Sequence, residues 1–253
     1  DAYILGEVWE DASNKCSYDV RRPYLQGEEL DSVMNYPWCN AILSFVRSGD
    51  ADAFYTAVMT ILDHYPWPSI ATLMTPLSTH DSVRALTALG VEHEVPAQDR
   101  PEYKMTQDEY WKGVQRLKLA ATLQYTLPGF PSLYYGDEIG MYGFADPWNR
   151  RTFSWDNIDA GLHDFYVRLG KMRRENTADF TRPLKFFDLD TGVIAYSRGS
   201  LLVVNASESD YQWPAMIDSL VFSTGNASIT ETGILVSRMS AAVFRLRKEY
   251  WQE

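Results

Sequence analysis

Side chains able to do chemistry follow short apolar runs at several points in the chain, beginning near its first residue. Residues 3–9 read YILGEVW, so three apolar residues lead into a glycine, the carboxylate of Glu7 and the indole of Trp9. A short buried parallel strand that delivers a functional side chain at its C-terminal end has this pattern. Alone, the stretch favours a solvated loop acid and a core tryptophan. Three similar units follow it, however, and each brings its own candidate residues.

A dense cluster of polar side chains follows the strand candidate at residues 70–75. Residues 76–84 read PLSTHDSVR and stand at the C-terminal end of that strand, where they can bind or catalyse. An isolated histidine is usually an ordinary surface or core residue. His80, however, lies beside Asp81 at the end of a strand, and this favours a functional site. For Arg84 the simpler interpretation is a residue that caps a helix or forms an ion pair near Asp81.

Two further strand candidates complete this region. Residues 30–36 form one of them, and it ends at Pro37 because proline cannot donate to a strand ladder. Residues 132–135 form the other and lead into the polar segment 136–138. A long irregular loop that contains residues 146–151, DPWNRR, follows the last strand.

Helical patterns separate the strands, as in the apolar stripe of Phe54, Ala57, Val58, Ile61 and Leu62. Thr106 and Glu109 form a capping-box pattern at the start of another helix. Four strand–helix units in a row predict a parallel sheet with right-handed crossovers. A doubly wound sheet and a (β/α)8 barrel both fit this pattern. Polar clusters at the strand ends favour the barrel, although a barrel needs eight strands and four are counted.

The pattern changes from about Arg182. Short alternating runs separated by turn residues predict an antiparallel β domain, a small sandwich, with strands at residues 184–187, 193–197, 201–205, 220–223, 234–237 and 242–246. The boundary falls near residues 178–183. The expected domains are therefore 1–180 and 181–253.

Composition excludes some partners. Of 253 residues, 45% are hydrophobic and 23% charged, and the net charge is −11. Nucleic acids and anionic membranes need clustered Lys and Arg, so neither is an expected partner. The 8 Trp, 16 Tyr and 11 Phe offer flat rings that suit the apolar faces of sugars, although many will fill the core. Neutral polyhydroxylated substrates are compatible with this charge.

The two cysteines, Cys16 and Cys39, are too few for a disulfide scaffold and lack metal-ligand spacing. They are expected to be free thiols in a reducing compartment. No run of 18 apolar residues occurs, so no membrane-spanning helix is expected.

Taken together, the motifs resemble the α-amylase family of glycoside hydrolases, in the branch of neopullulanase, cyclomaltodextrinase and maltogenic amylase. The resemblance rests on five segments in the family's order: GEVW at 6–9, GEELDSVMNYP at 27–37, LSTHDSVR at 77–84, GFPSLYYGDEIG at 129–140 and DPWNRRTFSW at 146–155. It covers nearly the whole chain, because the trailing β region corresponds to the family's domain C. It implies strands 5–8 of a TIM (β/α)8 barrel followed by a small antiparallel β-sandwich.

The resemblance implies roles for two carboxyl groups. Glu7 corresponds to the general acid/base, and Asp81 to the carboxylate that stabilises the transition state. A retaining glycosidase uses two carboxyl groups about 5–5.5 Å apart, one as nucleophile and one as acid/base. The acid/base must be protonated when the bond breaks, so a nearby anion and partial burial favour its role.

Four other residues are implied to bind the sugar. His80 would donate a hydrogen bond to the sugar in the cleaved subsite, and Trp9 would stack on the acceptor-side sugar. Asp146 and Arg151 would touch outer glycone sugars. No cofactor is implied as required and no metal site is expected; calcium is common in the family, but its usual ligands lie largely in the part of the domain absent here. The branch and the free thiols favour a cytoplasmic location.

The family's nucleophile is an aspartate in an Arg-x-Asp motif that precedes the acid/base, and no such motif occurs here. The chain is therefore expected to be the C-terminal portion of a larger enzyme, with half of a barrel, and to be inactive alone. Its open strand edges should pair with the missing N-terminal half of the barrel, self-associate, or be covered by loops.

Three interpretations compete. The first is a hydrolase acting on α-1,4-glucosidic bonds of starch, maltodextrin, cyclodextrin or pullulan, with the exact glucan and the balance of hydrolysis and transfer left open. The second is a non-catalytic, amylase-like protein that binds sugars or assists a transporter. The third is an unrelated α/β protein. The presence of Glu7, His80 and Asp81 favours the enzyme, and the ordered motifs disfavour chance.

Overall fold

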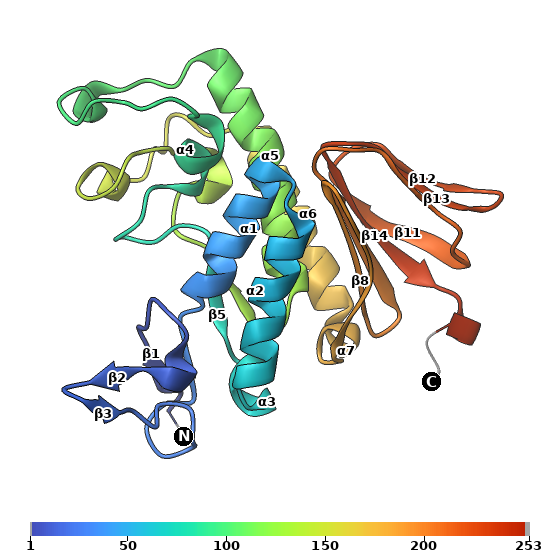
Figure 1. Cartoon of the computed structure of the whole chain (residues 1–253). Coiled ribbons are helices and arrows are strands. Elements are labelled where there is room, and N and C mark those ends of the chain that lie inside the picture. The colour runs from blue at the N-terminus through green and yellow to red at the C-terminus, as the bar shows by residue number, and fades with distance from the viewer. Residues whose placement is uncertain (1, 251–253) are drawn as a thin grey trace.

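The structure, a computed structural model, describes residues 2–250 of the chain. Figure 1 shows two parts side by side. Helices, loops and short strands extend as far as α7 (Thr177–Phe180), and an all-β part begins with β7 (Leu184–Asp190). The predicted order of an α/β region and then an antiparallel β region is confirmed.

Four short parallel strands carry the candidate site: β1 (Leu5–Gly6), β4 (Ser32–Val33), β5 (Met74–Pro76) and β6 (Phe130–Ser132). β1 pairs with β4, β5 pairs with β6, and a parallel bridge between Met34 and Met74 joins the two pairs. Their spatial order is the order of the chain. Within residues 2–250 the outer edges of β1 and β6 have no strand partner, so these residues do not close a cylinder.

The predicted strand at residues 30–36 was too long. Asn35 instead caps α1 (Tyr36–Ser48), because its side-chain oxygen accepts a hydrogen bond from the Trp38 amide. Pro37 is tolerated in the first helical turn, where its missing N–H would have no intrahelical acceptor. The proline therefore marks the start of a helix here, and not only the end of a strand.

Two other strand boundaries were also wrong. Ile70 belongs to α3 (Trp67–Ala71), and β5 begins only after it. β6 begins two residues before the predicted segment 132–135 and overlaps it only at Ser132. Short apolar runs fit a buried helix as well as a strand, and pattern alone does not separate the two.

The helical stripes follow the sequence closely. Their helices are α2 (Ala51–His64), α4 (Ala85–Gly90), α5 (Gln107–Thr126) and α6 (Ala160–Glu175). Phe54, Val58 and Ile61 are buried, and the predicted capping box of Thr106 and Glu109 is formed. Single 3-10 turns are η1 (Ala12–Asn14), η2 (Arg100–Glu102), η3 (Asp137–Ile139), η4 (Trp148–Arg150) and η5 (Lys248–Tyr250).

The C-terminal part is built from two antiparallel sheets. The larger sheet has the order β11-β14-β9-β8-β7 and the smaller β10-β13-β12. Their bounds are β8 (Val193–Arg198), β9 (Leu201–Ala206), β10 (Tyr211–Trp213), β11 (Ile217–Ser223), β12 (Ala227–Thr230), β13 (Gly233–Val236) and β14 (Ser240–Leu246). The six predicted strands are present, and β10 and β12 were missed. The exposed pattern of β12 gave no apolar alternation to detect.

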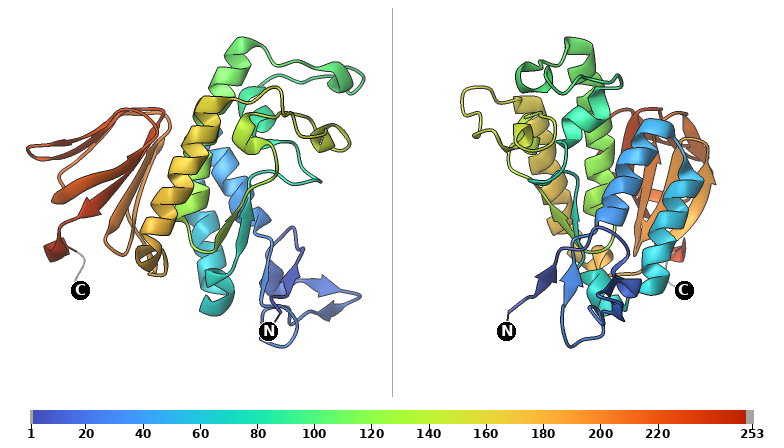
Figure 2. Two further views of the ribbon diagram at one scale, coloured as in Figure 1. Left: turned by 180° about the vertical axis from the view of Figure 1, so that it is seen from behind. Right: turned by 60° about the vertical axis from the view of Figure 1, so that its left-hand side comes forward.

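The central strands of the larger sheet are buried on both faces. Along β8, Ile194 and Tyr196 join the core beneath the helices, whereas Val193 and Ala195 join the second core between the sheets. This alternation follows from the two-residue period of a strand. Figures 1 and 2 show the helices α1, α2, α5 and α6 standing between the site-bearing loops and this sheet.

Polar contacts also join the two parts. The buried guanidinium of Arg198 donates to the Thr126 carbonyl at 2.7 Å and to the Arg182 carbonyl at 3.0 Å. Asn205 donates to the Leu119 carbonyl at 3.1 Å. The strands therefore hold α5 through buried hydrogen bonds as well as through apolar contact. None of the helices within residues 2–250 has the length and apolar character needed to cross a bilayer.

A separate antiparallel hairpin, β2 (Cys16–Ser17) and β3 (Val20–Arg21), projects from the loop after β1. Both cysteines are free; Cys16 is exposed and Cys39 is buried. Burial raises the pKa of the Cys39 thiol to about 12.

Candidate active site

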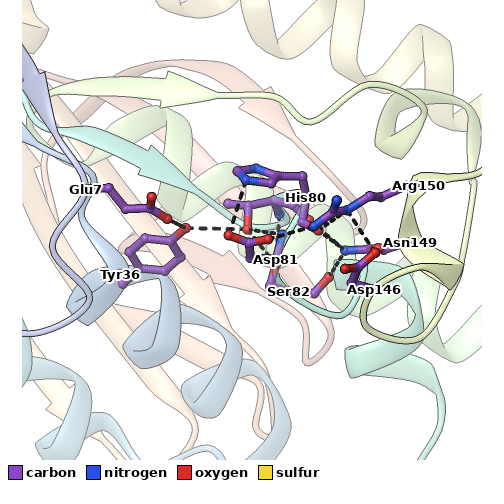
Figure 3. A network of polar contacts seen from close by, with 9 residues as sticks. Glu7, Tyr36, His80, Asp81, Ser82, Asp146, Asn149 and Arg150 are labelled. Atoms are coloured by element: carbon purple, nitrogen blue, oxygen red, sulfur yellow. Dashed lines mark hydrogen bonds and ion pairs between the residues drawn. The ribbon is translucent and has the colours of Figure 1, made fainter.

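Three loops that follow parallel strands meet in one place. Glu7 follows β1, His80 and Asp81 follow β5, and Asp146 belongs to the loop after η3, beyond β6. Figure 3 shows these side chains in a continuous set of polar contacts, with Glu7 and Tyr36 at one end and Arg150 at the other. Residues distant in the sequence are brought together because parallel strands point their carboxyl ends to the same face.

Tyr36, at the start of α1, lies between the two predicted carboxylates. Its hydroxyl is 3.4 Å from Glu7 Oε1 and 3.5 Å from Thr79 Oγ1. Burial raises the pKa of Tyr36, and the negative charges of Glu7 and Asp81 act in the same direction. The phenol therefore stays protonated near neutral pH, and both carboxylates are close enough to act on it.

The ring of Tyr36 also packs against the indole of Trp9. The two rings are stacked, with centroids 3.9 Å apart and an interplanar angle of 11°. Tyr36 is buried and Trp9 is exposed. A buried ring that supports an exposed indole fixes the orientation of a platform on which another flat face can stack.

Asp81 is held by two basic side chains. His80 Nε2 lies 3.2 Å from Asp81 Oδ2, and Arg150 Nη2 donates to Asp81 Oδ1 at 2.8 Å. Arg150 Nε lies 3.1 Å from Asp146 Oδ1 and donates to the His80 carbonyl at 2.9 Å. All four side chains remain partly exposed, so this charged cluster is open to a solute.

Not every predicted contact joins this cluster. Arg151 donates to the Pro101 carbonyl at 2.6 Å, and its role toward a sugar remains a prediction. The neighbouring Arg150 is the guanidinium that contacts Asp81. Tyr36 and Arg150 were not singled out from the sequence, although both lie inside the quoted motif segments 27–37 and 146–155.

Arg84 departs from its expected partner. Its guanidinium is fully buried and lies 3.0 Å from Asp137 Oδ1, so it does not pair with Asp81. It is the N-cap residue of α4, as one interpretation expected, but its side chain makes no capping hydrogen bond. Burial raises the pKa of Asp137 to about 7, although Arg84 opposes this rise. Both side chains are buried, so the pair stabilises the fold out of reach of a solute.

Within the described residues no group of three or more His, Cys, Asp or Glu side chains is arranged to hold a metal ion. The available chemistry is that of carboxylates, an imidazole, a phenol and a guanidinium. Such a set can donate and accept protons and can hold polyhydroxylated molecules by charge-assisted hydrogen bonds.

Comparison with known proteins gives a consistent result. The family model described as alpha amylase, catalytic domain, matches residues 1–181. Amylopullulanase of Thermoanaerobacter thermohydrosulfuricus is 32% identical over 240 residues, which cover 90% of this chain and 15% of that protein. Cyclomaltodextrinase of a Bacillus species is 32% identical over 204 residues, covering 78% of this chain and 31% of that protein.

Among solved structures, the debranching enzyme of Nostoc punctiforme in its native form has a TM-score of 0.75 at 23% identity. The match covers 96% of this chain and 52% of that one, and at this identity it shows the fold alone. The chain therefore spans about half the length, or less, of the relatives it matches.

Proposed function

Because the chain belongs to the α-amylase family of glycoside hydrolases, we propose that it supplies one side of the active site of a retaining enzyme. The bonds cleaved are α-1,4-glucosidic bonds of an α-glucan such as starch, maltodextrin, cyclodextrin or pullulan. The observation that supports this most is that Glu7 and Asp81 lie on either side of the Tyr36 hydroxyl, which is 3.4 Å from Glu7 Oε1 (Figure 3). The names of the relatives, amylopullulanase and cyclomaltodextrinase, agree with this class of substrate.

In the proposed mechanism Glu7 is the acid/base. It gives its proton to the glycosidic oxygen as the bond to the anomeric carbon breaks, so that the aglycone leaves neutral. A nucleophilic carboxylate takes the glycosyl group. Glu7, now ionised, then removes a proton from water, which attacks the anomeric carbon and releases the sugar with retained configuration.

In this mechanism Asp81 exchanges no proton and forms no covalent bond to the sugar. Its hydrogen bond from Arg150 stabilises the carboxylate, and its charge favours the positive character that develops on the sugar ring. His80, placed beside it, donates a hydrogen bond to a hydroxyl of the same sugar. These groups therefore act on the transition state more than on the ground state.

The remaining contacts position the glucan. Trp9 presents its exposed indole to the acceptor-side sugar, and its support by Tyr36 keeps the indole in place. Asp146 and Arg151 are proposed to contact outer sugars on the glycone side.

The nucleophile requires chain beyond these residues. No Arg-x-Asp triplet occurs in the sequence, and β1 and β6 have free outer edges in the described part of the fold. Exposed Ile4 lies beside β1 and exposed Phe130 begins β6. We assign these strands to positions 5–8 of the barrel, completed by an N-terminal half or, failing that, by a second copy.

An open cavity next to β6 agrees with this proposal. It has a volume of about 550 Å³ and is lined by apolar side chains that include Trp67, Tyr125 and Phe130. An exposed apolar hollow beside an unpaired strand is a surface that further packing would stabilise. The isolated chain is accordingly expected to show no hydrolysis.

The experiment measures hydrolysis of cyclodextrin, pullulan and starch by the longest natural polypeptide that contains these residues. Glu7→Gln should abolish cleavage of these substrates but retain a first-turnover release of the aryl group from aryl glucosides with good leaving groups, because that step needs no acid. Hydrolysis of the glycosyl-enzyme should be slow, because its base is lost. Glu10→Gln is the matched control, because Glu10 is an exposed neighbour paired with Lys15. Binding of maltodextrin without any cleavage by the wild type would contradict the enzyme and favour a sugar-binding protein.

A further inference from the structure

Asn149 is an uncharged residue at the base of the candidate site. It lies in η4, and its side chain is fully buried. Its Nδ2 atom contacts the carbonyl oxygens of Thr79, His80 and Ser82 at 3.2, 2.7 and 2.7 Å (Figure 3). One amide group therefore donates to three main-chain carbonyls of the turn on which Asp81 lies.

The turn also has internal hydrogen bonds, in which its backbone amides are the donors. The Thr79 amide donates to Ser82 Oγ at 2.8 Å, and the Asp81 amide donates to Thr79 Oγ1 at 3.2 Å. The Thr79 carbonyl accepts from the Ser82 amide at 3.4 Å, whereas the shorter bonds to the His80 and Ser82 carbonyls come from the loop after η3. Since a carbonyl lies in the plane of its peptide, Asn149 sets the peptide planes on both sides of His80.

The backbone of Asn149 is itself fixed from beneath. Arg84 Nε donates to the Asn149 carbonyl at 3.0 Å. The Arg84 guanidinium is in turn held by Asp137 at 3.0 Å and by the Tyr135 carbonyl at 2.8 Å. The loop after η3, the turn after β5 and the loop after β6 are thus connected through buried groups that no substrate has to touch.

We propose that Asn149 is a positioning residue, which aims the His80 imidazole and the Asp81 carboxylate at the sugar through their main chain. The side chain has to be an amide. Alanine would remove a donor from three carbonyls and would leave only the bond from Arg150 to the His80 carbonyl and the 3.4 Å bond from the Ser82 amide to the Thr79 carbonyl. A carboxylate would set an oxygen against carbonyl oxygens. This inference rests on the proposed function only where it predicts a change in enzyme activity.

The test compares Asn149→Ala and Asn149→Asp with wild type in the longest natural polypeptide that contains these residues. A displaced turn should lower kcat on maltodextrin by about 100-fold with little change in KM, because the displaced groups act in the transition state. Asn149→Asp should lose more than Asn149→Ala. Asn157→Ala, an exposed asparagine later in the same loop, should retain wild-type kcat.

A second measurement does not depend on activity. Hydrogen exchange of the Thr79, Asp81 and Ser82 amides should accelerate in Asn149→Ala, whereas exchange in α5 stays at its wild-type rate. Unchanged exchange in the turn would overturn the proposal, and so would an increase of equal size throughout the fold. If the wild type hydrolyses no glucan, the proposed function fails, and the exchange data still decide whether Asn149 holds the turn.

Discussion

The guanidinium of Arg150 donates a hydrogen bond of 2.8 Å to Asp81, 69 residues earlier in the chain. The same guanidinium contacts the carboxylate of Asp146 at 3.1 Å. One arginine thus links the loop after β5 to the loop after η3 and neutralises part of a local negative charge. Because the guanidinium contacts both carboxylates, Asp81 and Asp146 can lie close together without strong repulsion.

Replacement of Arg150 by lysine should reduce kcat/KM on maltodextrin by about 10- to 100-fold. A lysine cannot reproduce the fork that reaches Asp81 and the His80 carbonyl together. Stability should change by less than about 1 kcal/mol, since the pair is partly exposed. Steady-state kinetics and urea unfolding measure the two effects. Arg168→Lys, on the exposed face of α6, serves as control, and an unchanged kcat/KM in Arg150→Lys would contradict this role.

The two functions of Tyr36 can be separated by two variants. Tyr36→Phe removes the hydroxyl near Glu7 but keeps the ring under Trp9, so kcat should fall by about 10-fold. Tyr36→Ala removes the ring as well, and should raise KM for long maltodextrins in addition. Equal kinetic constants for the two variants would show that the ring does not support substrate binding.

The pH dependence of stability should carry the signature of Asp137. Its pKa is raised by burial from 3.8 to about 7, so between these values the folded state holds a proton that the unfolded state has lost. The contribution of Asp137 to the free energy of unfolding is therefore largest below about pH 4 and decreases as the pH rises to about 7. Urea unfolding of wild type and Asp137→Asn at pH 5 and pH 8 measures this. The difference between the two pH values should be smaller in Asp137→Asn, and equal differences would contradict a raised pKa.

The junction of the two parts should depend on Arg198. Its buried guanidinium donates to the carbonyls of Thr126, Phe180 and Arg182. Arg198→Ala leaves these acceptors without their donor and should lower the free energy of unfolding by about 3 kcal/mol. Arg238→Ala, an exposed arginine in the same β part, should change it by less than about 0.5 kcal/mol. Urea unfolding followed by far-UV circular dichroism measures both, and equal effects would remove Arg198 from this role.

Local structure was largely predictable from the sequence. The apolar stripe of α2 and the capping box of α5 both follow from spacings of a few residues. The strand boundaries were less predictable. At β4, for example, the apolar run fits a strand or a helix, and the strand stops where Asn35 caps α1. The identity of Glu7, His80 and Asp81 as candidates came from motif segments, since their chemistry requires those side chains.

Only the tertiary structure decided which side chains meet. Arg150 and Arg151 are chemically equal neighbours in the sequence, yet Arg150 ends η4 beside Asp81 and Arg151 is extended and contacts the Pro101 carbonyl. The partner of Arg84 likewise depends on the tertiary structure. The guanidinium is buried, and the carboxylate that it contacts there is that of Asp137. Helical periods and caps are fixed by neighbours along the chain. A contact between distant residues depends on the paths of two loops and on a rotamer, and no local spacing encodes these.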